Sequence, residues 1–143
     1  MESLLPAWLV WALLAAIFAA ATAITAKLGL RGVDADVGTL VRTIVVLTFA
    51  ATIVFARGKL PALGQLSARQ TLLLTLSGMA TGASWLCYFR ALHSGEASRV
   101  AVIDKLSVVL VALCAALLLG EKLSATGWCG VALVAVGAYL VAR

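Results

Sequence analysis

The sequence predicts an all-α integral membrane protein with five transmembrane helices. Of its 143 residues, 64% are hydrophobic and only 12% are charged, and the mean hydropathy is +1.11. Soluble domains contain about 45–50% apolar and about 25% charged residues. A soluble chain of this length buries only about 68–70% of its surface, so it would leave long apolar runs in water. A soluble globular protein is therefore excluded, and the lipid bilayer is the solvent for most of the chain.

The length of the apolar runs predicts the same fold as the high hydrophobic content and the low content of charged residues. A hydrocarbon core of about 30 Å needs about 20 helical residues. Five runs of that length lie between charged residues or Gly and Pro breaks. The predicted spans cover residues 7–26, 37–56, 70–92, 98–119 and 124–142. We expect residues 1–143 to form a single transmembrane domain with no extramembrane domain.

Local signals mark the ends of these spans in order. Pro6 opens the first span, in keeping with the preference for proline at helix starts. The second and third spans lie between charged residues, and His93 stands at the end of the third. Gly120-Glu121-Lys122 ends the fourth span, and Ser124 is a predicted N-cap of the fifth. The first span is too long for a signal peptide and lacks a preceding Lys or Arg, so we expect a retained helix.

The basic residues are divided almost evenly between the two membrane sides. Five spans place the termini on opposite sides. The loops on the N-terminal side carry four basic residues: Arg57, Lys59, Arg69 and Lys122. The other side carries five: Lys27, Arg31, Arg90, Arg99 and Arg143. Arg42 and Lys105 lie on the same side, slightly inside the helices. Because the positive-inside rule depends on this difference, two alternatives stay open: insertion in both orientations with inverted pairing, or a single orientation with the C-terminus inside.

The net charge of +5 does not indicate a nucleic-acid partner. The basic residues lie at the ends of apolar runs, where they anchor helices at lipid headgroups. No nucleophile–base pair or metal-binding set is visible, and the three cysteines are expected to be small buried hydrophobic residues. We therefore expect no enzymatic activity, no cofactor and no metal site.

Three charged residues lie about one turn or more inside the predicted spans. Arg42 lies about one turn inside the second span, and Asp104 and Lys105 lie one to two turns inside the fourth. Charges in a span are costly and are often functional. All three enter from the same membrane side, so Asp104 can neutralise Arg42 across helices, or Lys105 can extend to the headgroups. Two interpretations stay open: an ion pair that stabilises helix packing, or a substrate or proton site.

The third span carries a polar stripe. Ser77, Thr81, Ser84 and Tyr88 recur at helical spacing and share one face. Hydroxyls find no partner in lipid, so this face is expected to line the bundle interior or a water-filled cavity. The neighbouring face carries Gly78-x-x-x-Gly82, a spacing that permits close helix contact.

The first span has an aromatic and hydroxyl side that includes Trp11 and Thr22. Such a wall suits an amphipathic organic ligand. The alternative is that the hydroxyls bond to their own helix backbone. No span contains proline, so flexing is expected at glycines: Gly38, Gly78, Gly82, Gly130 and Gly137.

Two sequence stretches resemble a known family. The first is GEASRVAVIDKLS at Gly95–Ser107, and the second is GEKLS at Gly120–Ser124. Together with AKLG at Ala26–Gly29, these stretches make the chain similar to the EamA family of the drug/metabolite transporter superfamily. The resemblance covers essentially the whole chain, as one five-helix EamA-type repeat. Relatives often have proline where this chain has Val102, so the family-type break early in the fourth helix is not predicted here. Related four-helix exporters use a glutamate in their first helix, and the first span here offers no counterpart.

The resemblance implies a function. Larger members carry two repeats of opposite topology, so a single repeat implies an antiparallel homodimer. It further implies a small secondary transporter that exports small metabolites, amino acids or drug-like solutes across the bacterial inner membrane by alternating access. The expected substrate cavity is lined by Trp11, Thr22, Ser77, Thr81, Ser84 and Tyr88, and gated by Arg42, Asp104 and Lys105. The alternatives are an accessory membrane subunit that transports nothing and a subunit of a lipid-linked sugar flippase.

Overall fold

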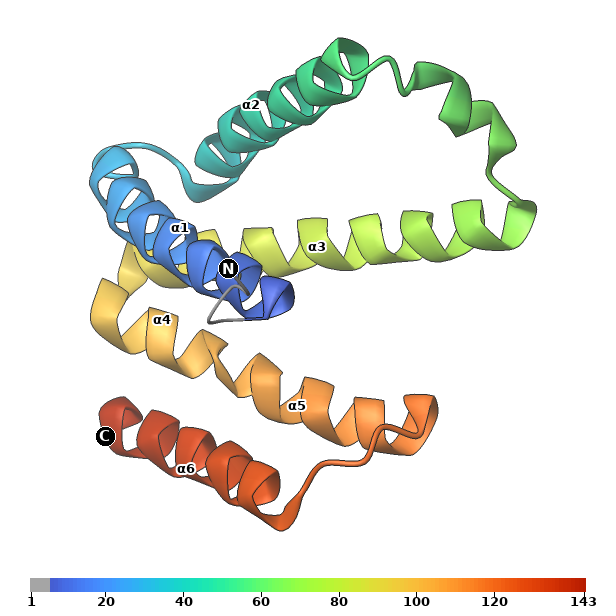
Figure 1. The fold of residues 1–143 in the computed structure, drawn as a ribbon. Helices are drawn as coiled ribbons and strands as arrows, with labels where there is room; N and C mark the ends of the chain where they lie inside the picture. Colours follow the sequence, from blue (N-terminus) through green and yellow to red (C-terminus); the bar gives the residue numbers. More distant parts are fainter. Residues whose placement is uncertain (1–5) are drawn as a thin grey trace. The chain divides into compact units, whose positions relative to one another are not determined.

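The structure is a computed structural model that describes residues 6–143, and over these residues the chain contains only helices and their connections (Figure 1). Five helical segments are long and apolar enough to span a membrane: Ala7–Gly29 (α1), Ala35–Ala56 (α2), Ala68–Ser94 (α3), Ala97–Leu119 and Ala125–Ala142 (α6). The predicted fold class is therefore confirmed, and each segment begins and ends within three residues of the expected span. Residues 1–5 of the expected domain 1–143 lie outside the described residues.

The chain divides into two compact units, and each is described by itself. The terminal unit comprises Met1–Ile24 and Ser94–Arg143, and the central unit comprises Thr25–His93. The terminal unit contains most of α1, the fourth spanning segment and α6. The central unit contains the last turn of α1, all of α2 and nearly all of α3, with a short 3₁₀ helix, Leu60–Gln65 (η1), between α2 and α3.

In the terminal unit, α6 packs along the fourth spanning segment. This segment consists of α4 (Ala97–Asp104), α5 (Leu106–Cys114) and a π-helical turn, Ala115–Leu119 (η2), and α6 contacts both α4 and α5. Gly120 ends η2 in a left-handed conformation, with φ of 69°, which glycine adopts without steric cost. Ser124 then caps α6, because its hydroxyl accepts a hydrogen bond from the Gly127 N–H at 3.1 Å. The predicted N-cap is confirmed.

The fourth spanning segment is interrupted at Lys105, although it contains no proline. The Lys105 N–H donates to the Val102 carbonyl at 3.1 Å, and the Val108 N–H donates to the Lys105 carbonyl at 3.0 Å. Both bonds join residues three apart, which is the tighter 3₁₀ pattern. The interruption does not stand at any of the glycines where flexing is expected, and that expectation stays a prediction. The Lys105 ammonium lies 3.9 Å from the carboxylate of Asp104. Adjacent residues do not face each other on a regular α-helix, so local tightening accompanies this pairing.

In the central unit, side chains cap the starts of both long helices. The Asp34 carboxylate accepts hydrogen bonds from the N–H groups of Asp36 at 2.9 Å and Val37 at 3.1 Å, which caps α2. At the start of α3, the Ser67 N–H donates to the Gln70 side chain at 2.8 Å and the Gln70 N–H donates to the Ser67 hydroxyl at 3.3 Å. This reciprocal pair is a capping box. Both helices therefore begin at polar residues that lie just outside the apolar runs.

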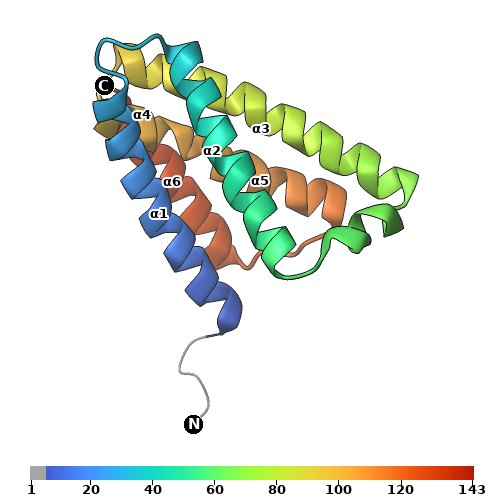
Figure 2. The same ribbon diagram turned by 90° about the horizontal axis from the view of Figure 1, so that it is seen from above.

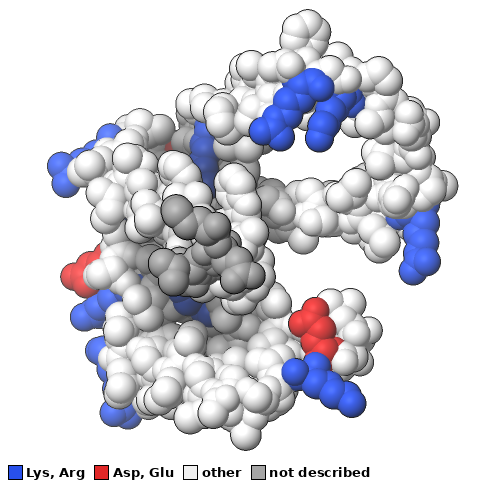
Figure 3. All heavy atoms as spheres, viewed as in Figure 1, with Lys and Arg blue, Asp and Glu red and all other residues white. Residues whose placement is uncertain are grey.

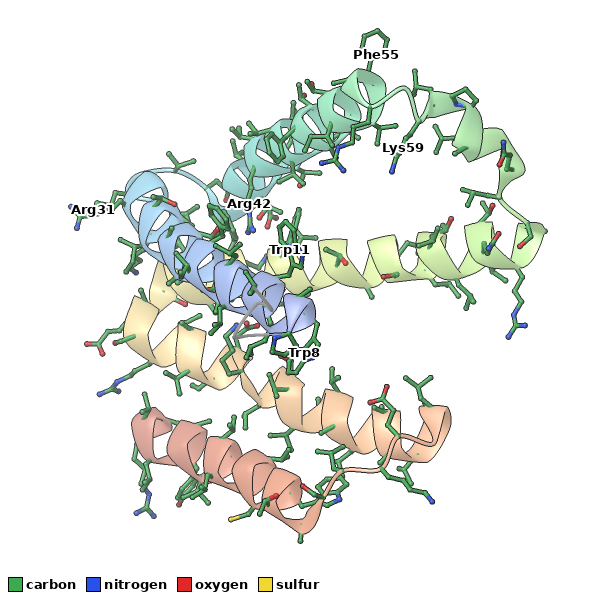
Figure 4. The ribbon with its side chains drawn as sticks, viewed as in Figure 1. Trp8, Trp11, Arg31, Arg42, Phe55 and Lys59 are labelled. Carbon is green, nitrogen blue, oxygen red and sulfur yellow. The ribbon has the colours of Figure 1, made fainter. Side chains whose placement is uncertain are left out.

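Helices α2 and α3 meet at one end only. They approach each other where α2 begins and α3 ends, and they diverge toward η1 (Figures 1 and 2). Phe55 projects outward from the far end of α2 (Figure 4), with 73% of its surface exposed. Basic side chains gather over this far end and the connection that follows it, where the sequence has Arg57 and Lys59 (Figure 3). These cations lie where they can contact lipid headgroups.

A small buried cluster lies where α2 and α3 meet. Leu30, Phe89 and Leu92 are almost completely buried, and the buried Thr39 hydroxyl donates to the Ala35 carbonyl at 2.9 Å. Gly38 permits this close packing. A Cβ atom at position 38 would lie 2.6 Å from Cδ2 of Leu30 and 3.6 Å from Cδ1 of Phe89. The absence of a side chain at this position therefore lets the start of α2 pack against both residues.

We expect Gly38→Val to lower the free energy of unfolding by about 1–3 kcal/mol, because overpacking a tight contact costs that much. The matched control is Gly130→Val in α6, where a Cβ atom has no neighbour within 4 Å. Unfolding of both variants in mixed detergent micelles, followed by circular dichroism, measures the difference. Equal unfolding curves for the two variants would show that the contact at Gly38 does not constrain the fold.

Candidate functional site

Arg42 is a charged residue within the apolar length of α2. It lies seven residues after the first residue of the helix, which is about 10 Å along the axis. Its guanidinium carbon lies 4.4 Å from the centroid of the Trp85 ring and 5.3 Å from that of Phe89, and Figure 4 shows it on the first part of α2. Both distances are in the range of cation–π contacts. The two rings therefore stabilise this cation where water is scarce.

An ion pair joins the start of α2 to the end of α3. Arg90 donates from Nε to one carboxylate oxygen of Asp36 at 3.0 Å and from a terminal nitrogen to the other oxygen at 2.9 Å. This bidentate geometry is the strongest and most directional form of the arginine–carboxylate contact. Both side chains are more than half exposed in the chain. The pair therefore acts mainly by orienting the two helices.

Lys27, near the end of α1, makes a further polar contact with α3. Its ammonium group donates a hydrogen bond to the backbone carbonyl of Leu92, in the last turn of α3. Carbonyl groups in the last turn of a helix lack partners within the helix, and a cation near them is favoured by the helix dipole. Lys27 thus supplies a partner for a carbonyl beside the buried cluster.

The contacts between α2 and α3 share one register. Asp36 pairs with Arg90, position 38 faces Phe89, and Arg42 contacts Trp85. Residue numbers rise along α2 as they fall along α3, so the two helices are antiparallel, as expected for consecutive spans. The Asp36–Arg90 pair lies at the end of the helices, and Arg42 lies about 9 Å further along α2. The Asp36–Arg90 pair and Arg42 therefore lie at two different depths along the helices.

The polar stripe of α3 is exposed over most of its length. Ser77, Thr81 and Ser84 are exposed in the chain, and Tyr88 is half-buried. The Thr81 hydroxyl donates to the Ser77 carbonyl at 2.9 Å, so its own helix satisfies it. The hydroxyls of Ser77 and Ser84 have no hydrogen-bond partner among the described residues.

The other expected cavity residues lie in the terminal unit. Trp11 is 72% exposed, and Thr22 is half-buried on the same helix. Asp104 and Lys105, which contact each other, also belong to this unit. Arg42 and the α3 stripe belong to the central unit. A common cavity and the Arg42–Asp104 pair therefore both stay predictions.

Sequence reasoning missed the Asp36–Arg90 pair and the role of Trp85. Asp36 lies directly before the expected second span, and Arg90 lies near the end of the third. Because consecutive spans are antiparallel, these two positions are at similar depth, and their opposite charges are a signal that pairs them. Along the third span, Trp85 lies about one and a half turns deeper than Arg90, which is similar to the depth of Arg42 along the second span. Depth matching between neighbouring spans would have found both contacts.

The cysteines lie on the surface of the chain. Cys87, Cys114 and Cys129 are all free and exposed, so the expectation that they are buried is wrong. Positions along an apolar helix need no protein neighbour when lipid is the solvent, and lipid covers such a side chain equally well. Among the described residues, no group of three or more His, Cys, Asp or Glu residues is arranged to hold a metal ion.

We expect reversal of one charge, in Asp36→Arg or in Arg90→Asp, to lower the melting temperature of the detergent-solubilised protein. Each single variant places like charges face to face, whereas the double variant restores an opposite pair in the same position. The double variant should therefore recover more than half of the loss. Additive losses in the double variant would mean that the two side chains do not interact.

Comparison with known proteins identifies the family. Residues 6–143 match the profile of the EamA-like transporter family. The chain is 53% identical over 135 residues to a protein of Sinorhizobium sp described as "Uncharacterized transporter in cobO 3'region", and the match covers 94% of this chain and 96% of that protein. No solved structure matches the chain. The family and the five apolar spanning helices indicate an integral membrane protein, consistent with a bacterial inner membrane. The chain belongs to the EamA-like transporter family.

Proposed function

We propose that this protein is a small secondary transporter that exports small metabolites, amino acids or drug-like solutes across the bacterial inner membrane. It acts as an antiparallel homodimer by alternating access. Membership of a transporter family supports transport. The observation that carries the proposal is Arg42, a cation inside a span that contacts aromatic rings and has no carboxylate of the central unit in ion-pair range. Ionisable residues within membrane spans commonly mark a substrate or ion pathway.

The length of the chain and of its relative supports the homodimer. The Sinorhizobium protein matches over 96% of its own length, so it is also a single repeat in size. Transporters are commonly built from two repeats of opposite topology with the binding site between them. A second copy of this chain, inserted upside down, supplies the missing repeat. The nearly even division of basic residues between the two sides is compatible with such insertion.

The exposed face of α3 gives a place for the second copy. A Cβ atom at Gly78 or Gly82 would meet nothing within 4 Å, so this stretch of α3 has room for a close neighbour. Ser77 and Ser84, on the adjoining stripe, have hydroxyls that lack a hydrogen-bond partner among the described residues. Small residues let membrane helices approach closely, and hydroxyls then bond across the contact. Both features favour a helix of a second copy, or a water-filled cavity, over lipid.

Alternating access needs a part of the chain that bends. The break at Lys105 and the π turn η2 divide the fourth spanning segment into short helical pieces. Broken helices near the binding site are typical of secondary transporters. We propose that this segment bends during transport, and that Asp104 and Lys105 help to gate the cavity. An accessory subunit that transports nothing, and a subunit of a lipid-linked sugar flippase, are the alternatives.

Dual insertion is tested by cysteine labelling of two loops on opposite sides. In a variant whose three cysteines are replaced by alanine, a single cysteine is placed at Gly64, in η1, or at Val33, in the connection between α1 and α2. Sealed vesicles are treated with a membrane-impermeant maleimide before and after permeabilisation. If both orientations are present, about half of each cysteine reacts before permeabilisation, since the charge bias is weak. Complete labelling of one position and none of the other would contradict the antiparallel homodimer.

We expect Asp104→Asn to reduce transport without preventing insertion. Vesicles with and without the protein are loaded with a cell metabolite extract, and the solutes that the protein moves are identified by mass spectrometry. Loss of one charged contact, worth about 1.5 kcal/mol, should slow movement of those solutes roughly tenfold. The control is Glu121→Gln, which removes an acidic residue outside the spans. Unchanged transport by Asp104→Asn would limit Asp104 to helix packing, and the absence of any moved solute would favour an accessory subunit.

A further inference from the structure

We infer that Arg42 and the Trp85 ring form a binding site for the anionic group of an organic solute, either a carboxylate or a phosphate. The inference rests on the proposed transport function, and it adds the chemical class of the substrate. It concerns the central unit alone, because Arg42, Trp85 and Phe89 all lie within Thr25–His93.

Three other cations of the described residues each have a carboxylate partner. Arg90 pairs with Asp36, Arg99 with Glu96 at 3.1 Å, and Lys105 lies 3.9 Å from Asp104. Within the central unit, no carboxylate lies within ion-pair distance of Arg42, and its guanidinium group contacts the rings of Trp85 and Phe89. A guanidinium group in an apolar span is stable only with a compensating partner. The partner must therefore come from outside the central unit, and we assign this role to the anionic group of the solute.

The chemistry of the guanidinium group selects the anion. Contacts with aromatic rings use its positive charge, whereas its five N–H donors point outward from the edges of its plane. Two parallel N–H groups match the two oxygens of a carboxylate or the oxygens of a phosphate. A lysine in this place would offer a point charge without the paired geometry. Within the central unit Arg42 donates no hydrogen bond to a protein acceptor, so its N–H donors are available for a bidentate anion.

Trp85 supplies a surface for the rest of the solute. Phe89 is 3% exposed and lies within the buried cluster, whereas Trp85 is half-buried and presents part of its ring at the surface of the chain. The Tyr88 side chain, from the expected cavity stripe, lies close enough to Arg42 to interact with its charge. A flat aromatic surface beside a cation suits a solute with an apolar body and one anionic group. The phosphate of a lipid headgroup has the same anionic chemistry. Arginine side chains of membrane helices extend toward such headgroups, so a lipid is a second source of this anion.

The test follows the fluorescence of Trp85. In a variant with Trp8, Trp11 and Trp128 replaced by phenylalanine, Trp85 is the only tryptophan that remains. The protein in phosphatidylcholine nanodiscs is titrated with benzoate and phenyl phosphate, and with benzamide as the uncharged control of the same shape. We expect a saturable change with the two anions and a response to benzamide that is weaker by about tenfold or more, since a charged contact is worth at least one decade of affinity.

Substitutions at Arg42 decide whether this residue binds the anion. Arg42→Gln should abolish the response to benzoate, and Arg42→Lys should retain part of it, because the charge stays but the paired donors are lost. Arg57→Gln, which removes a cation from the connection after α2, should leave it unchanged. Circular dichroism shows whether each variant folds, and Arg42→Lys keeps the test informative if Arg42→Gln does not.

Three results would overturn the inference. Equal responses to benzoate and benzamide would show that charge is not recognised, and a full response by Arg42→Gln would assign the anion to another residue. A fluorescence change on replacing phosphatidylcholine with phosphatidylglycerol, without any response to benzoate, would assign the partner to a lipid headgroup. Transport is measured separately in vesicles. Solute movement without anion binding would refute this site alone, whereas anion binding without solute movement would refute the proposed transport.

Discussion

The need to partner polar groups in a bilayer determines how α2 meets α3. Apolar side chains gain little by leaving lipid for protein, so the hydrophobic effect alone does not bring membrane helices together. Where the two helices meet, the chain instead uses the Asp36–Arg90 pair, the contact of Lys27 with the Leu92 carbonyl, and the stacking of Arg42 on Trp85. Away from this end the two helices diverge, and no ion pair of the described residues joins them. Packing in the central unit therefore follows its charges.

Hydropathy was sufficient to predict the spans but not their contacts. The length of an apolar run and the bilayer thickness together determine a spanning helix, so the five segments could be located to within three residues. A contact also depends on how each helix is rotated about its axis. Arg42 and Asp104 have similar depths but belong to different units, so their pair stays a prediction, whereas the central unit itself supplies Trp85 and Phe89 as partners of Arg42. Depth identifies candidates, and rotation selects among them.

The fourth spanning segment shows a similar gap between pattern and geometry. Neither proline nor glycine stands at the break, so the usual signals predicted a regular helix there. The break instead coincides with Asp104 and Lys105, two opposite charges in adjacent positions. A regular helix would direct them about 100° apart into an apolar surrounding. Local 3₁₀ bonding at Lys105 accompanies their approach, so the irregularity coincides with a pair of charges and not with proline or glycine.

The polar stripe and Arg42 differ in how strongly each requires a partner. Thr81 satisfies its hydroxyl within its own helix, and the same option is open to other Ser and Thr residues, so a hydroxyl stripe requires an outside partner less strongly than a charge does. A guanidinium group has five donors and a full charge, and the carbonyls of its own helix carry no charge that could neutralise it. Arg42 thus has a requirement that the central unit meets only in part, through two aromatic rings. The stripe suggests where a solute passes, whereas Arg42 gives a physical reason for a solute of one chemical class to bind.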